Sequence, residues 1–304
     1  MPNPAARDAF VAHAYPEHTV DLGEVVMNYA VTGALDSPAL LLIPGQTESW
    51  WGFEKAMALL EADFQVFAVD LRGQGRSTWT PGRYTLDNMG NDLARFIDLV
   101  IGRPAIVSGC SSGGVLAAWL SAYAPPDEVR AAHYEDPPLF ASETAPPIGP
   151  SIRETMVAPV FELFVTFLGD QWRVGDWAGL LAAARAASMP FPEEPSQSLM
   201  EYDPEWARAF LEGTVGAACR HEAMLAAVKV PVLFTHHARH VDPATGRLMG
   251  AITDPQAARV GEIVRATGAP FTYVSLPDAA HPMHAADPPR FAEVLGTWAK
   301  ALPW

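Results

Sequence analysis

The stretch from Pro104 to Trp119 (PAIVSGCSSGGVLAAW) constrains most strongly how this chain can fold. Its apolar start predicts a buried strand and its apolar end predicts a helix, with a G-x-S-x-G motif centred on Ser111 between them. A strand that turns this sharply into a helix holds the central serine in a strained conformation, and only glycine fits at Gly109 and Gly113. We therefore predict that Ser111 is a nucleophile; the alternative is a Gly/Ser-rich loop without chemistry.

Two backbone amides are candidates for binding a negative charge that develops beside Ser111. The turn leaves the N–H of Ser112 at the start of a helix, where it has no partner within the helix. The apolar run Ala39–Ile43 predicts a buried parallel strand, and the glycine turn after it presents the N–H of Gln46. We predict that these two amides form an oxyanion hole; the alternative for Gln46 is an ordinary turn at a strand end.

Strand and helix patterns alternate along most of the chain, which predicts an open, mostly parallel sheet. From residue 138 to residue 226 the alternation stops, and helical stretches rich in Trp, Phe and Met replace it. We expect a core of residues 1–137 and 227–304 and an inserted helical cap, or lid, of residues 138–226 over the site. The expected strands are an initial pair within Val20–Thr32, then Ala39–Ile43, Phe64–Val69, Ala105–Val107, Val129–Tyr134, Val230–Thr235 and Phe271–Leu276. The expected helices are Phe53–Leu60, Leu86–Val100, Val115–Trp119, Phe161–Leu168, Trp172–Ala187, Pro204–Glu212, Asp254–Thr267 and Pro289–Leu302.

Charge and cysteine content exclude several classes of protein. A formal net charge of -15 argues against nucleic acid and against anionic membrane surfaces as partners. Two cysteines, Cys110 and Cys219, do not make a disulfide framework and fit a reducing compartment. The sequence begins without a basic segment followed by an apolar one, and no apolar run is long enough to span a bilayer. We expect a cytoplasmic protein without a membrane partner.

Several segments together resemble the α/β-hydrolase family over nearly the whole chain. These are IPGQ, DLRGQGRS, GCSSGG, the expected lid, and AAHPMHAADP at 279–288. The resemblance implies an α/β-hydrolase fold with an eight-stranded, mostly parallel sheet flanked by helices. The segments QTESWW, SSGGVLAAWLSAYA, YDPEWARAF and THHARHVDPATG look like the bacterial zearalenone hydrolases. Those enzymes open the macrocyclic ester of a fungal resorcylic lactone, and the opened acid then loses carbon dioxide.

A serine hydroxyl needs a base to take its proton, and the base needs an acid to orient it. The order expected on this fold is serine, acid, histidine. His281 and His284 follow the last expected strand, on the loop that faces Ser111. His281 matches the family position in AHPMH, so we predict His281 as the base and His284 as a histidine of a helix start or the surface.

The acid is less strongly constrained. The usual family position follows the strand Val230–Thr235, but counting along the pattern reaches no carboxylate there, and Asp242 comes two residues late. The zearalenone hydrolases place a glutamate after the preceding strand, in a segment resembling HYEDP, which maps onto Glu135. We predict Glu135 as the acid, with Asp242 second and Asp136 third. The alternative for Glu135 is a strand-end carboxylate that caps a nearby amide.

Substrate contacts come from the resemblance and from proximity along the chain. Trp206, in PEWAR, matches a family tryptophan that contacts the substrate, and the alternative is a buried tryptophan that packs the lid. We expect Gly45, Tyr202, His133 and Pro138 as further neighbours of the pocket. The HHxxH cluster at 236–240 has metal-ligand spacing, but adjacent histidines at a strand end point to opposite sides. We therefore expect no metal.

The resemblance implies a serine hydrolase that opens a zearalenone-type lactone through an acyl-enzyme, without metal or organic cofactor. Its expected partner is a small-molecule lactone or ester, and a homodimer is one possible oligomeric state. The alternatives are a general carboxylesterase or C–C hydrolase with the same triad, and a small-molecule receptor that retains it. Haloalkane dehalogenases and epoxide hydrolases share the fold but need an aspartate where this chain has Ser111.

Overall fold

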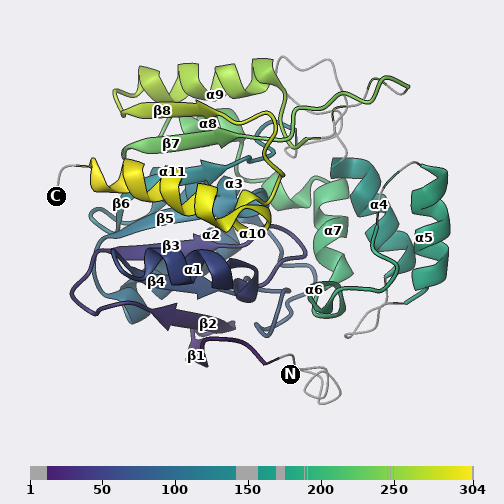
Figure 1. Ribbon diagram of the computed structural model, residues 1–304, viewed down its shortest axis with the longest axis horizontal. Helices are drawn as coiled ribbons and strands as arrows, with labels where there is room; N and C mark the ends of the chain where they lie inside the picture. The colour runs from purple at the N-terminus through teal and green to yellow at the C-terminus, as the bar shows by residue number, and fades with distance from the viewer. Residues whose placement is uncertain are drawn as a thin grey trace.

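One eight-stranded sheet runs through the molecule in the computed structural model, which describes residues 12–141, 157–168, 175–187, 189, 191–244, 246, 248 and 250–302. The strand order is β1-β2-β4-β3-β5-β6-β7-β8 (Figure 1). Two antiparallel pairings, β1 with β2 and β2 with β4, begin the sheet, and all later neighbours pair in parallel. The prediction of an eight-stranded, mostly parallel sheet is confirmed.

The strands lie close to their predicted positions. Their bounds are β1 (Glu17–Asp21), β2 (Val26–Thr32), β3 (Ala39–Ile43), β4 (Gln65–Val69), β5 (Ala105–Cys110), β6 (Val129–Glu135), β7 (Val232–His236) and β8 (Phe271–Ser275). Every residue of β3, β4, β5 and β7 is buried, as continuous apolar runs between two helical layers require. The strand β5 runs to Cys110, three residues beyond its predicted end at Val107.

Helices cover both faces of the sheet. The core helices are α1 (Glu54–Leu60), α2 (Leu86–Phe96), α3 (Ser112–Tyr123), α8 (His221–Leu225), α9 (Asp254–Ala266), α10 (Met283–Ala286) and α11 (Pro288–Lys300). Apolar side chains of α1 and α11 fill one core against the sheet, while those of α2, α3, α8 and α9 fill the other. Among the described residues, no helix is both long and apolar enough to cross a membrane.

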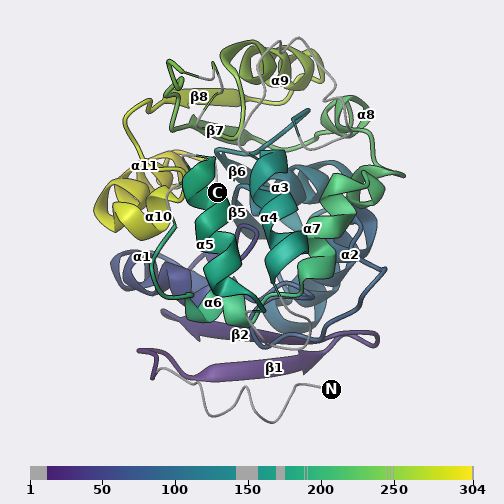
Figure 2. The ribbon, with the colours of Figure 1, turned by 90° about the vertical axis from the view of Figure 1, so that its right-hand side faces the viewer.

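Within the described residues, four α-helices besides α8 lie between β6 and β7 in the chain, where the cap is expected. They are α4 (Val157–Phe167), α5 (Trp177–Ala186), α6 (Gln197–Met200) and α7 (Pro204–Leu211). They gather at the edge of the sheet toward which the parallel strands point, and they cover that edge when it faces the viewer (Figures 1 and 2). The boundaries of core and cap at 137, 138, 226 and 227 stay a prediction.

The predicted helix Trp172–Ala187 begins later than its apolar pattern suggested. Residues 172–174 lie outside the described residues, and α5 starts at Trp177. Asp176 precedes it, and its side chain accepts a hydrogen bond from the N–H of Gly179. An aspartate in this position satisfies an amide that the first turn leaves unpaired, and it therefore marks the helix start.

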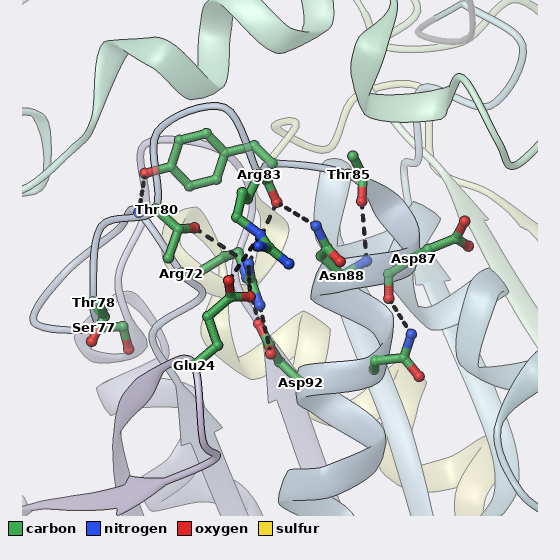
Figure 3. A network of polar contacts seen from close by, with 12 residues as sticks. Glu24, Arg72, Ser77, Thr78, Thr80, Arg83, Thr85, Asp87, Asn88 and Asp92 are labelled. Carbon is green, nitrogen blue, oxygen red and sulfur yellow. Dashed lines mark hydrogen bonds and ion pairs between the residues drawn. The ribbon is translucent and has the colours of Figure 1, made fainter.

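The loop after β4 connects the sheet to α2 and to the loop after β3. The guanidinium of Arg72 binds Asp92 of α2 through two hydrogen bonds, at 2.6 and 2.8 Å, and a third at 3.1 Å reaches Glu24 (Figure 3). Arg72 is almost fully buried, so these carboxylates compensate a charge removed from water. Gln74, two residues further on, turns its amide to the loop after β3, where it accepts the N–H of Thr47 at 2.5 Å.

The sharp turn from β5 into α3 depends on glycines. A Cβ atom on Gly109 would lie 2.0 Å from the carbonyl oxygen of Gly113, and one on Gly113 would lie 2.4 Å from the carbonyl oxygen of Ile43. Real side chains do not approach backbone atoms this closely, so α3 packs against β5 and β3 only because both positions lack a side chain. This is the close approach that the G-x-S-x-G motif predicted.

The substitution Gly113→Ala should lower the free energy of unfolding by roughly 1–3 kcal/mol, because the new methyl group overpacks a backbone contact. The matched control is Gly296→Ala in α11, where the nearest atom to a new Cβ is Leu60 Cδ2 at 3.9 Å. Alanine favours a helix over glycine by about 1 kcal/mol, so the control should be neutral or stabilising. Urea unfolding followed by circular dichroism measures both, and equal effects of the two substitutions would contradict the packing argument.

Candidate active site

Ser111 occupies the turn between β5 and α3 in a strained backbone conformation, with φ 54 and ψ -120. A residue with a side chain held at such angles costs of order 1–3 kcal/mol, and the surrounding structure must enforce it. Two hydrogen bonds do so: the Ser111 N–H donates to the carbonyl oxygen of Glu135 at 2.8 Å, and the Gly114 N–H donates to the carbonyl oxygen of Ser111 at 2.9 Å. The predicted elbow at Ser111 is therefore present, with the serine at its tip.

His281 lies on the loop between β8 and α10 and lines the same pocket as Ser111. Its Nδ1 lies 2.6 Å from Oδ2 of Asp136, the residue that follows β6. The other oxygen of Asp136 accepts the backbone N–H of His237 at 3.1 Å, which fixes the carboxylate. Because Nδ1 of a neutral His281 donates to Asp136, its Nε2 carries the lone pair and is free to take a proton.

The pairing of His281 with Asp136 corrects the predicted role of Glu135. Both oxygens of Glu135 contact His284 instead: Oε1 accepts the His284 N–H at 3.0 Å, and Oε2 lies 3.0 Å from Nδ1. Successive residues at a strand end point to opposite sides, so Glu135 and Asp136 cannot both turn toward His281. Asp136 leaves the strand with φ 43, a bend that the sequence did not reveal.

Asp242, the second candidate for the acid, lies on the loop after β7. Its Oδ1 accepts the N–H of Ala244 at 2.9 Å, as expected of an aspartate before a proline in a turn. Asp136, the third candidate, holds Nδ1 of His281. The structure therefore places the least favoured of the three predicted carboxylates beside His281, the predicted base.

Burial and the attraction between opposite charges shift the pKa values of His281 and Asp136 in opposite directions, and in both residues the attraction has the larger effect. Burial alone would lower the pKa of His281, but the hydrogen bond and charge of Asp136, with smaller contributions from Glu48 and Glu135, raise it above 6.5. Burial alone would raise the pKa of Asp136, but its contacts with His281 and His237 bring that pKa below its ordinary 3.8. The carboxylate therefore stays ionised and stabilises a proton on His281.

Three backbone amides of the loop after β3, those of Gly45, Thr47 and Glu48, donate hydrogen bonds within the loop or to the loop after β4. The N–H of Gly45 donates to Oε2 of Glu48 at 2.7 Å, the N–H of Thr47 donates to Gln74 at 2.5 Å, and the N–H of Glu48 donates to the carbonyl oxygen of Gly45 at 3.3 Å. Gln46 differs, because its N–H donates to no residue in the described part of the chain. We call residues 44–48 the oxyanion loop.

Ser112 offers the second amide. It is the first residue of α3, so its N–H has no acceptor within the helix, and it donates to no other residue of the ranges described. Gln46 and Ser112 both line the pocket beside Ser111. Two unpaired amides beside a serine hydroxyl are what an oxyanion hole requires.

The pocket has a polar floor and apolar walls. Its volume is about 250 Å³. Ser111, Ser112 and His281, with Gln46 and Thr47 of the oxyanion loop, make the floor, and the apolar side chains of Pro138, Val160, Phe161, Phe164, Phe210 and Ala251 make the walls. Phe161 and Phe164 come from α4 and Phe210 from α7, so the cap helices supply most of the apolar contact.

The predicted substrate neighbours divide into one that lines the pocket and four that do not. Pro138 lines it. His133 is fully buried in the sheet, between the hydroxyls of Ser108 and Thr235, and Gly45 packs behind Ser111 in the oxyanion loop. Burial, aided by the neighbouring histidines His237 and His284 and opposed by the charge of Glu135, lowers the pKa of His133 to about 4, so it stays neutral.

Trp206 and Tyr202 lie behind the pocket wall. Trp206 is fully buried and packs its ring against Tyr84, Tyr202 and Phe210. Tyr202 is also buried, and its hydroxyl accepts a hydrogen bond from the side-chain amide of Gln46. The structure therefore favours the alternative reading of Trp206, a tryptophan that packs the cap, over direct contact with substrate.

The three phenylalanines of the apolar walls were not among the residues predicted from the sequence, and neither was Glu48. The richness of the cap in aromatic residues was visible, but no motif distinguished a side chain that faces the pocket from one that faces the cap interior. Glu48 lies inside the QTESWW segment that carried the family resemblance. The sequence does hold one signal for Glu48: it lies three residues after the turn glycine Gly45, so its carboxylate can accept a hydrogen bond from the Gly45 N–H.

Two groups of residues have the composition of metal ligands. The ligand atoms of Cys110, Glu135 and His284 lie within 4.8 Å of one another, but both oxygens of Glu135 already accept hydrogen bonds from His284. His236 and His237 face apart: His236 bonds Tyr273 and the carbonyl oxygen of Ile252, and His237 bonds carbonyl oxygens of the His281 loop. We assign a metal to neither group.

Comparison with known proteins gives the class of fold. A family model described as alpha/beta hydrolase fold matches residues 38–174. The structure of E-2-(acetamidomethylene)succinate hydrolase aligns with a TM-score of 0.64 and 20% identity, over 94% of this chain and 100% of that one. The enol-lactonase from Burkholderia xenovorans aligns with a TM-score of 0.64 and 16% identity, over 93% of this chain and 100% of that one. The chain has the α/β-hydrolase fold.

Similarity to curated proteins is local. The chain is 31% identical over 109 residues to 3-oxoadipate enol-lactonase 2 from Acinetobacter baylyi, which covers 35% of this chain and 40% of that protein. It is 32% identical over 133 residues to bifunctional epoxide hydrolase 2 from Sus scrofa, which covers 43% of this chain and 23% of that protein. The chain thus spans less than half the length of either relative.

The pairing predicts a specific change in the titration of His281. In Asp136→Asn, burial remains while the hydrogen-bonded carboxylate is lost, so the pKa of His281 should fall below its ordinary 6.5. In Glu135→Gln the pKa should fall less, because Glu135 acts on His281 only through its charge. Proton NMR of the imidazole signal, assigned by its absence in His281→Gln, measures both shifts. A larger shift in Glu135→Gln would contradict the observed pairing.

Proposed function

We propose that this chain is a serine hydrolase of uncharged carboxylic esters and lactones, and that a zearalenone-type macrocyclic lactone is its substrate. One observation carries the proposal: Ser111, the His281–Asp136 pair and two unpaired amides meet at the floor of one apolar pocket. Each part has a defined task in acyl transfer.

The reaction proceeds in two halves. Nε2 of His281 takes the proton of the Ser111 hydroxyl as its oxygen attacks the ester carbonyl, and the amides of Gln46 and Ser112 donate to the resulting oxyanion. The C–O bond of the ester then breaks, and His281 gives the proton to the leaving oxygen. In a lactone this oxygen stays tethered to the acyl group on Ser111. Asp136 remains ionised throughout and stabilises the imidazolium.

Water completes the cycle. His281 takes a proton from water as the water oxygen attacks the acyl-enzyme, and the same two amides hold the second oxyanion. Collapse of this intermediate returns the proton to the oxygen of Ser111 and releases the hydroxy acid. A resorcylic acid formed in this way loses carbon dioxide without help from the enzyme, as in the zearalenone hydrolases that the sequence resembles.

The charge around the pocket favours an uncharged substrate. Among the residues known to line it, none is Lys or Arg, while Asp136, Glu135 and Glu48 lie close behind its floor. A substrate carboxylate would be buried here without a partner, which is costly. The compounds in the names of 3-oxoadipate enol-lactonase 2 and E-2-(acetamidomethylene)succinate hydrolase carry carboxylates. We propose that the substrate of this chain differs from those compounds in charge.

The aromatic walls favour a substrate with a flat ring. Phe161, Phe164 and Phe210 can pack edge or face against an aromatic ring, as a resorcylic lactone presents beside its ester. A general carboxylesterase is the second candidate, because the walls offer few polar groups that would select one lactone. The epoxide hydrolases among the relatives need an aspartate nucleophile, and this chain has Ser111.

Incubation with zearalenone tests the substrate and the nucleophile together. The wild-type protein should add water and then lose carbon dioxide from the product, which mass spectrometry detects. The variant Ser111→Ala should keep the fold and lose at least about 10³-fold in rate, because no other group in the pocket replaces the hydroxyl. Comparable rates for the two proteins would exclude Ser111 as the nucleophile. Turnover of simple esters without turnover of zearalenone would exclude the lactone as substrate and favour a general carboxylesterase.

The proposed charge preference has a test with two matched esters. The acyl groups of 4-nitrophenyl butyrate and mono-4-nitrophenyl succinate have the same chain length, but succinate ends in a carboxylate. We expect kcat/KM to be at least about tenfold lower for the succinate ester, because a difference of about 1.4 kcal/mol in transition-state binding already gives that factor. Release of nitrophenol reports both rates. Equal or faster hydrolysis of the succinate ester would refute the preference.

A further inference from the structure

A second carboxylate–histidine pair, Glu135 with His284, lies next to the pair that faces the pocket. Both side chains have zero exposure, and Glu135 binds the backbone N–H and the ring Nδ1 of His284, each at 3.0 Å. The ring of His284 is stacked on Phe53, with 4.0 Å between ring centroids, so its plane is fixed. The pocket mechanism uses neither Glu135 nor His284.

The far side of His284 faces the oxyanion loop. Its Nε2 lies 3.8 Å from Oε2 of Glu48, within ion-pair distance but outside hydrogen-bond distance. The same oxygen of Glu48 accepts the N–H of Gly45 at 2.7 Å. Three ionisable side chains thus form a continuous line, Glu135–His284–Glu48, from the end of β6 to the backbone of the oxyanion loop.

Charges along this line are complementary. Burial alone would lower the pKa of His284, but the charges of Glu135 and Glu48 raise it above 6.5. Burial alone would raise the pKa of Glu135, but His284 brings it to about 2. The two carboxylates therefore favour a positive charge on His284, which lies between them. Without it, the charge of Glu48 would oppose the oxyanion that the neighbouring amides must bind.

The loop has little freedom at the point where Glu48 holds it. A Cβ atom on Gly45 would lie 2.8 Å from Oε2 of Glu48 and 3.2 Å from Cβ of Ser111, so Gly45 fits between the carboxylate and the nucleophile. Thr47, on the other side of Gln46, has φ 67, which is unfavourable for a residue with a β-branched side chain. Contacts on both sides of Gln46 must therefore enforce the direction of its N–H.

We propose that Glu48, held by His284 and Glu135, is a positioning residue that sets the oxyanion loop so that the Gln46 N–H points at the developing charge. The inference rests on the proposed function and deepens it. Glu48 does not line the pocket and acts through the backbone of Gly45. Glu135 and His284, two residues that the sequence singled out, thereby gain a role distinct from proton transfer.

The test compares Glu48→Ala with Glu48→Gln, because truncation of the fully buried Glu135 or His284 risks unfolding the protein. On 4-nitrophenyl butyrate, Glu48→Ala should lower kcat by roughly ten- to a hundredfold, somewhat less than the complete loss of one oxyanion donor. Its KM should change by less than about twofold, because pocket walls are untouched. Glu48→Gln should recover most of kcat, since its side-chain oxygen still accepts the Gly45 N–H.

Two ketone inhibitors separate positioning from general damage. Propyl trifluoromethyl ketone adds to the Ser111 hydroxyl and places an oxyanion in the hole, whereas propyl methyl ketone binds without that adduct. In Glu48→Ala the affinity for the first should fall by the same factor as kcat/KM, and the affinity for the second should stay unchanged. The variant Glu293→Ala, which removes an exposed carboxylate of α11, is the control and should match the wild type.

Three outcomes would overturn the inference. An unchanged kcat in folded Glu48→Ala would show that the loop needs no carboxylate, and equal weakening of both ketones would show a general effect on the pocket. If the wild-type protein neither hydrolyses the ester nor reacts with a fluorophosphonate at Ser111, the proposed function fails and the inference falls with it. Labelling and turnover in the wild type, with no effect of Glu48→Ala, would refute the positioning role alone.

Discussion

Two adjacent carboxylates at the end of β6 are the interaction on which the site depends, because one is paired with His281 of the loop after β8 and the other with His284 of α10. Asp136 holds Nδ1 of His281 at 2.6 Å, and Glu135 holds Nδ1 of His284 at 3.0 Å. The first pair opens to the pocket, while the second is fully buried and faces the oxyanion loop. One strand end thus orients the base and anchors the loop segment that carries it.

The same strand end supports Ser111, the proposed nucleophile. In the sheet, Cys110 of β5 pairs with Glu135 of β6, and the next amide, that of Ser111, donates to the carbonyl oxygen of Glu135. Ser111, His281 and Asp136 are therefore tied to one point of the parallel sheet, where β5, β6 and the loop after β8 converge. The helices α4 and α7 add the phenylalanines of the pocket walls.

The sequence predicted those parts of the site that depend on local backbone geometry. The G-x-S-x-G motif determined the turn at Ser111, because the glycines at 109 and 113 have no room for a Cβ atom. The buried strands followed from continuous apolar runs. The choice between Glu135 and Asp136 depends on where β6 ends and how the chain bends at Asp136, with φ 43, and no local pattern encodes that bend. Trp206 matched a family position, but a match cannot separate a wall residue from one packed behind it.

The most direct measurement is kcat/KM for 4-nitrophenyl butyrate in Asp136→Asn and in Glu135→Gln, each corrected for its folded fraction. If Asp136 orients His281 and Glu135 acts only through the loop, Asp136→Asn should lose roughly 10³- to 10⁴-fold. In Glu135→Gln, kcat/KM should fall by no more than about a hundredfold, because only one oxyanion donor, the Gln46 N–H, would be misplaced. A greater loss in Glu135→Gln than in Asp136→Asn would contradict this account of the site.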